Sequence, residues 1–400
     1  MPAIRKSGGR TANRYFWNGI GIQKDGRGRQ NGRERGSTDK MEDKENFSVS
    51  EGHMDPALEE ANTSEAVREG KAPFYNMKKG FSRIGWSLVA VLGIWQILML
   101  LIGFAAIWQE ELYDLPAVSF YNRYLLLFNE GTLAAALIVG SFLLRPIPCS
   151  APARRPFSGG RFFQLLCICF AVSIAGSLIG SLFLSLWNAV SGSSVGNAVS
   201  EVIFETDPWL NLLTVGLLAP VLEELFFRKL LIDRMYRYGE KICILLSALL
   251  FALFHMNFSQ FFYAFGAGVI LAYLYCRSGK IWLCILLHAV FNCFSGVLNS
   301  EIAGRLIERM DSIAGMTNEE LAALTFSDLS IVLVALFYYL LFFGLAIAGL
   351  VLFCVKIRRF RFQQGEIVIP EKARSVVFLN AGMIAALIFT IGMMVYSLFV

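Results

Sequence analysis

Charged residues are scarce in this sequence, and long stretches contain none. Asp, Glu, Lys and Arg together make up 17% of the 400 residues, whereas hydrophobic residues make up 56%. A soluble domain needs more charge than this to cover its surface. The scarcity of charge therefore excludes an ordinary soluble protein and favours an integral membrane protein.

Several common catalytic and ligand-binding motifs are absent as well. The sequence has no Gly-rich phosphate loop, no GxSxG nucleophile turn, no HExxH metal-binding pair and no obvious repeat. Its eight cysteines show no CxxC spacing and fall mostly inside apolar stretches. We therefore interpret them as small packing residues rather than as a disulfide framework or a metal site.

Long apolar runs take up most of the chain. Four of them are about as long as the roughly 20 residues that cross a bilayer core, and three around positions 242–298 are shorter or more polar, as protein-buried spans can be. The runs cover 84–108, 122–144, 162–187, 209–232, 242–257, 260–276, 281–298, 331–355 and 376–400. The sequence therefore predicts an all-α, polytopic transmembrane helix bundle of about eight to nine spans.

Charge alternates between the segments that connect these runs. Basic residues gather in alternate segments, and the segments between them lean acidic, as at 110–114, 201–207 and 311–328. The basic segments lie at 78–83, 145–161, 234–241, 277–280 and 356–374. Because basic loops remain in the cytoplasm, we predict a cytoplasmic N-terminus and, with nine spans, an external C-terminus.

The first 76 residues have a different composition. Residues 5–35 are rich in Arg, Gly and Asn, and residues 38–69 are mixed in charge and poor in aromatics. We predict that residues 1–76 form a disordered tail, solvated rather than bound to nucleic acid. Met77 stands directly before two lysines and looks like a natural translation start, so our hypothesis is that residues 1–76 are a wrongly assigned extension.

Ionisable residues inside the fourth run are the first sign of chemistry, because each costs roughly 2.5 to 3.5 kcal/mol on insertion scales. Glu224 and Arg228 stand four residues apart on one helix face, in the order that favours an ion pair. Glu223 is rotated by about 100° from Glu224, so it remains freer for proton transfer. A plain alternative is a charge cluster at a cytoplasmic helix end.

Two of the three histidines also lie in apolar spans. His255 follows Phe251 by four residues, and His288 precedes Asn292 by four, so that each pair shares a helix face. A single buried histidine is more often a packing residue than a catalyst. Two histidines, an asparagine and a Glu-Glu-Arg cluster in nearby spans favour a functional site, which helix tilt could gather in a cavity open to the cytoplasm.

Together these residues resemble the three motifs of the CPBP family of membrane proteases. That family includes type II CAAX prenyl endopeptidases and Abi-like proteins of bacteriocin processing and self-immunity. The matching motifs are Glu223-Glu224-x-x-x-Arg228, Phe251-x-x-x-His255 and His288-x-x-x-Asn292. The resemblance covers about residues 205–300. We accordingly expect N-terminal membrane helices at 77–200, catalytic helices at 201–300, and an outer loop with C-terminal membrane helices at 301–400.

The resemblance implies a role for each of these positions. Glu223 would activate water with help from His255, His288 and Asn292 would stabilise the oxyanion, and Glu224 with Arg228 would support the site. A zinc ion is an alternative that the residues leave open, because Glu223, His255 and His288 could bind Zn²⁺ and leave a position for water. We prefer a metal-free mechanism.

The predicted function is hydrolysis of a hydrophobic or membrane-tethered peptide by an intramembrane endopeptidase. The substrate partner would be such a peptide or a small membrane protein in the lipid bilayer, with no nucleic acid, and the location a bacterial plasma membrane. The first alternative is a non-catalytic bacteriocin-immunity or peptide-binding protein that uses the same cavity. An ion-coupled transporter is a more distant alternative, since no paired broken helices are evident.

Overall fold

The computed structural model describes most of the chain after the predicted tail. The described residues are 56–114, 116–196, 198–326, 329–367, 369 and 375–399, with side chains from residue 76 onward except at 198 and 199. Residues 1–55, with His53, and parts of two charged loops at 327–328 and 370–374 therefore lie outside them. The first helix begins at Pro56, inside the segment predicted as tail.

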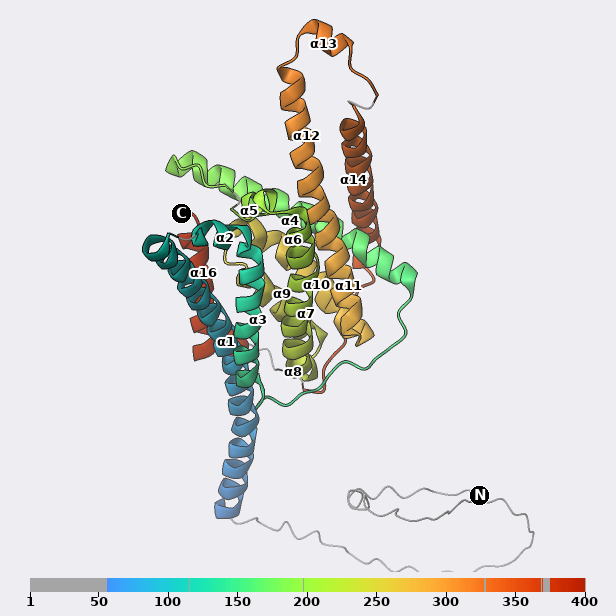
Figure 1. Cartoon of the computed structure of the whole chain (residues 1–400). Helices are drawn as coiled ribbons and strands as arrows, with labels where there is room; N and C mark the ends of the chain where they lie inside the picture. Colours follow the sequence, from blue (N-terminus) through green and yellow to red (C-terminus); the bar gives the residue numbers. More distant parts are fainter. Residues whose placement is uncertain are drawn as a thin grey trace, which may run out of the picture. The chain divides into compact units, whose positions relative to one another are not determined.

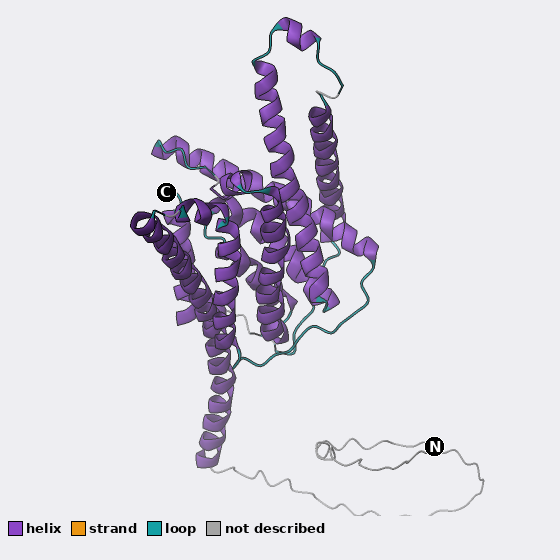
Figure 2. Cartoon of the chain, in the orientation of Figure 1, coloured by secondary structure: helices purple, strands orange, loops and turns teal. Residues whose placement is uncertain are grey.

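Contacts divide the chain into two units, Met1–Glu59 and Glu60–Val400, and the second contains the helical bundle. Figure 2 shows helices joined by loops, and no strand occurs in the described residues. The longer helices are α1 (Pro56–Tyr113), α3 (Leu125–Leu144), α4 (Gly159–Ser191), α9 (Glu240–Phe254), α10 (Phe258–Ser278), α11 (Ile281–Asn292), α12 (Leu298–Ala314), α14 (Ser330–Ile357) and α16 (Ala381–Tyr396).

Short elements complete the described chain. The α-helical ones are α2 (Ala117–Arg123), α5 (Ala198–Glu205), α6 (Pro208–Asn211), α7 (Ala219–Glu224), α8 (Asp233–Met235), α13 (Asn318–Ala322) and α15 (Ser375–Phe378). Three are π-helical, η1 (Leu212–Leu218), η2 (Leu225–Ile232) and η4 (Cys293–Val297), and η3 (Tyr236–Tyr238) is a 3₁₀ turn.

Helices long and apolar enough to cross a membrane number seven in the described residues. They are Asn76–Tyr113, Leu125–Leu144, Gly159–Ser191, Pro208–Tyr238, Phe258–Ser278, Ile281–Ala314 and Ser330–Ile357. The two other predicted spans correspond to α9 and α16, which are helical but only 15 and 16 residues long. The chain is therefore an all-α polytopic membrane protein, as predicted.

The outer surfaces of the bundle are apolar. Large hydrophobic side chains of α1, α4, α14 and α16 are exposed, among them Phe104, Leu178, Phe337, Leu340 and Ile388. A water-soluble monomer rarely exposes contiguous apolar surface on this scale, whereas lipid tails solvate it at no cost. These faces therefore belong against the hydrocarbon of the bilayer.

The centre of the bundle is α10, which packs against both α4 and α9. Close approach to α4 depends on Gly176, because a Cβ there would lie 2.5 Å from the Cα of Tyr263. Small residues allow helix backbones to approach closely in membranes, where van der Waals packing replaces the hydrophobic effect between helices. Figure 1 shows α4 crossing the other long helices at a steep angle.

The last part of the chain includes α12, α13 and α14, which extend away from the rest of the bundle. Helix α12 continues in line from α11 and η4, with α13 at its tip, and α14 returns beside it (Figure 1). The joined helix Ile281–Ala314 has 34 residues, so it is about 50 Å long and exceeds a hydrocarbon core of about 30 Å. Its polar second half, which includes Glu301, Arg305 and Glu308, therefore extends beyond the core.

Candidate active site

The predicted glutamates lie at the centre of one long, irregular helix. The segment Pro208–Tyr238 is a single membrane-length helix that continues past the expected end at residue 232, so Glu223 is midway between its ends. The π-helical turns η1 and η2 flank α7, which carries both glutamates. π-Helical turns within α-helices often occur at functional sites because they free backbone groups and re-aim side chains.

Pro220 leaves two backbone carbonyls free to accept hydrogen bonds from the helix that contains α11 and η4. Proline has no N–H, so it supplies no donor to the carbonyl of Gly216 in an α-helical pattern or of Val215 in a π-helical pattern. Both carbonyls accept from the other helix instead. Asn292 Nδ2 donates to Val215 O at 3.0 Å, and Cys293 Sγ lies 3.8 Å from Gly216 O. The predicted oxyanion residue Asn292 is thereby held beside the helix Pro208–Tyr238, which carries both glutamates and is named the glutamate helix.

Glu224 is the structural member of the glutamate pair. Its Oε1 lies 2.9 Å from Arg228 Nη1 and 2.9 Å from His288 Nδ1, and all three side chains are buried. An ionised carboxylate only accepts hydrogen bonds, so His288 Nδ1 carries the hydrogen. The ion pair between Glu224 and Arg228 is therefore present as predicted, and Glu224 also orients the imidazole of His288.

Glu223 is buried as well, but its carboxylate makes fewer polar contacts than that of Glu224. Its Oε2 lies 3.7 Å from His288 Nε2, beyond the reach of a hydrogen bond, and no ion pair to Arg228 is formed among the described residues. His288 thus stands between the two glutamates, bonded to Glu224 and facing Glu223. A carboxylate that keeps an uncommitted oxygen next to an oriented imidazole has the arrangement that general-base chemistry requires.

His255 joins the cluster through an aromatic ring. The edge of Phe251 packs against His255 and His288, with ring centroids 5.1 and 5.8 Å apart, and the guanidinium of Arg228 lies 4.3 Å from the centroid of the same ring. His255 Nδ1 is 2.9 Å from Phe251 O and must donate to it, so the free nitrogen is Nε2. No direct bond from His255 to Glu223 occurs in the described structure.

Helix α10 packs against Arg228 and Phe251 at Gly268. Arg228 Nη2 donates to Gly268 O at 3.5 Å. A Cβ at Gly268 would lie 3.0 Å from Ala248 Cα and 3.1 Å from a ring carbon of Phe251. Glycine therefore lets the α10 backbone reach both the buried guanidinium and the aromatic ring that joins the histidines.

Two residues near Glu223 were not predicted from the sequence. Glu130 in α3 is buried and interacts electrostatically with Glu223, and so does Tyr263 in α10, whose hydroxyl accepts from Gln260 Nε2 at 2.8 Å. A signal for Glu130 exists, because it is the only charged residue between 125 and 144. Tyr263 stands among other aromatics, and its position offers no such signal.

The predicted zinc ligands do not form a metal site in this geometry. No group of three or more His, Cys, Asp or Glu side chains in the described residues is arranged to hold a metal ion. Glu223 and His288 are close, and the ring of Phe251 contacts both His288 and His255. The residues therefore do not fit a bound zinc ion as they stand, and the mechanism below contains no metal step.

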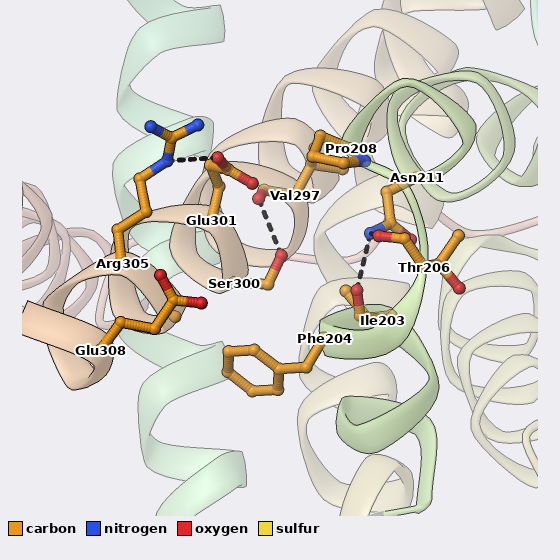
Figure 3. A pocket seen from close by; sticks show the side chains of 11 residues that line it. Ile203, Phe204, Thr206, Pro208, Asn211, Val297, Ser300, Glu301, Arg305 and Glu308 are labelled. Atoms are coloured by element: carbon orange, nitrogen blue, oxygen red, sulfur yellow. Dashed lines mark hydrogen bonds and ion pairs between the residues drawn. The ribbon is translucent and has the colours of Figure 1, made fainter. Parts of the chain in front are cut away.

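Two cavities of the described structure lie away from these residues. One of about 290 Å³ is lined by α5, α6 and the start of α12, including Asn211, Ser300 and Glu301. In Figure 3, Glu301 lies beside Arg305, and Asn211 lies on the opposite side. Another of about 460 Å³ lies between α12 and α14. Neither is lined by Glu223 or a histidine, so the predicted cavity at the glutamates and its opening to the cytoplasm stay predictions.

Membrane-length helices around a buried cluster of carboxylates, imidazoles and one guanidinium define an integral membrane protein with a polar intramembrane site. The chain's relatives agree with this class. Residues 205–294 match the family described as type II CAAX prenyl endopeptidase Rce1-like. This match confirms the resemblance of this region to the CPBP membrane proteases. All the site residues predicted from the sequence lie within it, whereas Glu130 lies outside it.

One relative is the Bacillus subtilis (strain 168) protein named "Putative membrane peptidase YdiL". It is 25% identical to this chain over 104 residues, which are 26% of this chain and 43% of that protein. The similarity therefore spans less than half of the relative's length and about a quarter of this chain. No solved structure matches the chain.

Proposed function

We propose that this protein is a membrane-embedded endopeptidase that hydrolyses a hydrophobic peptide or a small membrane protein. The observation that carries the proposal is the separation of roles within the glutamate pair. Glu224 is committed to Arg228 and His288, while Glu223 is buried beside His288 without a hydrogen bond to it. The Rce1-like match over residues 205–294 supports the same function.

Glu223 is the general base of the proposed reaction. Its carboxylate takes a proton from a water molecule while the water oxygen attacks the carbonyl carbon of the scissile peptide bond. His255 Nε2 is free to accept a hydrogen bond from the second hydrogen of that water, because Nδ1 donates to Phe251 O. The protonated Glu223 then gives its proton to the leaving nitrogen as the C–N bond breaks. The products are a carboxylic acid and an amine, which exchange a proton to give a carboxylate and an ammonium group.

The oxyanion of the tetrahedral intermediate needs donors that are already in place, which is commonly the largest stabilising contribution in acyl transfer. Asn292 uses one Nδ2 hydrogen on Val215 O and retains the other. In its doubly protonated form, His288 keeps Nδ1–H on Glu224 and offers Nε2–H. These two side chains on neighbouring turns of α11 therefore supply the oxyanion site.

The proposed setting is a bacterial plasma membrane with the N-terminus in the cytoplasm. Support comes from the basic segments at 145–161, 234–241 and 277–280, which lie on one side of the bundle. The segment 145–161 contacts the ends of both neighbouring helices, since Ser150 N–H donates to Asp233 O and Arg155 N–H to Ser278 O. Substrate would enter from the cytoplasmic side. Prenylated substrates are not required by this proposal, since the reaction described above acts on a peptide bond and needs no lipid group.

The test is cleavage of a quenched hydrophobic peptide library by the full chain purified in detergent. Wild type is expected to cleave peptides, and Glu223→Gln to lose at least about 100-fold in kcat while still binding them, because general-base catalysis contributes about 10²- to 10⁴-fold. A zinc chelator should leave the wild-type rate unchanged.

Two results would change this account. Cleavage that survives Glu223→Gln in the folded protein would contradict the proposed base. Cleavage that is lost with the chelator and restored by added zinc would replace the metal-free mechanism. Peptide binding without cleavage by the folded wild type would support the non-catalytic peptide-binding alternative instead.

A further inference from the structure

Glu130 places a third carboxyl group beside the glutamate pair, from outside the region that matches the protease family. It lies in α3, which packs against α7, η1 and η2, the elements that surround Glu223. Its carboxyl group interacts electrostatically with that of Glu223. Glu130 is therefore an electrostatic neighbour of the proposed base and belongs to the same site.

One oxygen of this carboxyl group has no partner. Glu130 is 6% exposed, and Oε1 accepts from Asn129 Nδ2 at 3.1 Å. Oε2 is buried and makes no hydrogen bond to any described residue. A buried, unsatisfied carboxylate oxygen costs free energy, so its retention next to a catalytic group calls for a donor that arrives from outside the chain.

The charges of the site point to the kind of donor. The buried site holds the carboxyl groups of Glu130, Glu223 and Glu224 but one guanidinium, that of Arg228. When all three carboxyl groups are ionised, the single guanidinium leaves two negative charges in excess. A buried charge is stable only when it is paired, and Arg228 is already committed to Glu224 and Gly268 O. A cationic ligand would reduce the excess of negative charge.

We propose that Glu130 is a specificity-determining residue whose free carboxylate oxygen binds a cationic side chain, Lys or Arg, close to the scissile bond of the peptide substrate. This inference rests on the proposed peptidase function and names its substrate class as apolar peptides that carry one basic residue. Glu130 contacts the substrate and takes no part in proton transfer to or from the peptide bond.

The test uses pairs of apolar peptides that differ at one position, Lys in one and the uncharged norleucine in the other, with the position moved along both sides of the scissile bond. Wild type is expected to favour Lys over norleucine at one position by about tenfold or more in kcat/KM, the selectivity that a charge-assisted hydrogen bond provides. Glu130→Gln should reduce that ratio to about one.

Three comparisons separate specificity from a structural role. Glu130→Gln should lose more kcat/KM on the Lys peptide than on the norleucine peptide, and Glu130→Asp should retain part of the Lys preference. The ratio of Glu-peptide to norleucine-peptide cleavage should be higher for Glu130→Gln than for wild type. Glu301→Gln serves as the control, because Glu301 pairs with the exposed Arg305 outside the site and should leave every ratio unchanged.

The inference is overturned if Glu130→Gln keeps the Lys preference, if wild type has none, or if the variant loses activity on both peptides alike. Cleavage of the norleucine peptide tests the proposed function separately, since it requires Glu223 and no cation. Should no peptide be cleaved, the affinities of the same peptides, measured by fluorescence anisotropy, still decide the inference: wild type must bind the Lys peptide more tightly, and Glu130→Gln must not.

Discussion

Two ionic clusters include residues of the helix Pro208–Tyr238, and they differ in burial and in charge balance. The site cluster has three carboxyl groups and one guanidinium. The balanced cluster, nearer the helix end, has one cation for each acid: Lys229 with Asp233 at 2.7 Å and Arg277 with Glu240 at 2.8 Å. The balanced cluster comprises Lys229, Asp233, Glu240, Tyr275 and Arg277, and the site cluster comprises Glu130, Glu223, Glu224, Arg228 and His288.

The balanced cluster joins elements together. Asp233 also accepts from the Tyr275 hydroxyl at 2.7 Å, which links α8 to α10, and Glu240 accepts from the backbone N–H of Gln363 at 2.7 Å, which ties the segment after α14 to the start of α9. Each acid is therefore paired with a cation and accepts from a further donor of the chain, although Glu240 Oε1 has no hydrogen-bond partner among the described residues. The site cluster leaves Oε2 of both Glu130 and Glu224 without a partner. Excess buried charge is retained where chemistry or binding needs it.

The largest change in stability is expected where the site cluster loses its cation. Arg228→Met leaves the fully buried Glu224 without its guanidinium, and breaking a buried pair from one side costs about 3 to 5 kcal/mol. Thermal unfolding in detergent measures this loss. The double variant with Glu224→Gln removes both charges and should recover much of the stability. A double variant as unstable as Arg228→Met would contradict the pairing.

A smaller loss of stability is expected in the balanced cluster. Glu240→Gln weakens the bonds to Arg277 Nη2 and to the N–H of Gln363, and bonds to a charged group contribute about 1.5 to 3 kcal/mol. We expect Glu240→Gln to unfold at a lower temperature than wild type and to keep kcat within about threefold of wild type. A loss of kcat without a loss of stability would place Glu240 in the site instead.

The smallest expected effect concerns the attachment of α11 to the glutamate helix. Pro220→Ala supplies an N–H that competes for the carbonyls now used by Asn292 and Cys293. We expect kcat to fall about tenfold, roughly 1.4 kcal/mol, with stability unchanged or higher because an interior proline is removed. Pro156→Ala, in an exposed loop, is the control. An unchanged kcat in Pro220→Ala would mean that Asn292 is held by other contacts.

Local patterns of the sequence predict much of this structure. Apolar runs of membrane length locate the helices, and the spacing of four residues predicts the pair of Glu224 with Arg228, because both signals depend on neighbours along one helix. The short helices α9 and α16 were also found as apolar runs, although neither reaches membrane length in the structure.

Other features depend on how helices meet, and no local pattern contains them. Glu130 joins the site only because α3 packs against α7, and Phe251 connects the two histidines only because α9 lies beside α11 and the glutamate helix. The π-helical turns before and after α7 were not predicted from the sequence either, although Pro220 lies close to the first of them. Tertiary packing decides such contacts, so the sequence alone could not predict them.

The most direct measurement compares Glu223→Gln and Glu240→Gln in the same detergent preparation, by peptide cleavage and by thermal unfolding. Removing a negative charge from the site cluster should lower kcat at least about 100-fold and leave the unfolding temperature equal or higher. Removing one from the balanced cluster should lower the unfolding temperature and preserve kcat. If Glu223→Gln unfolds at lower temperature and still cleaves peptides, the site cluster is structural, and the proposed catalytic role of Glu223 is wrong.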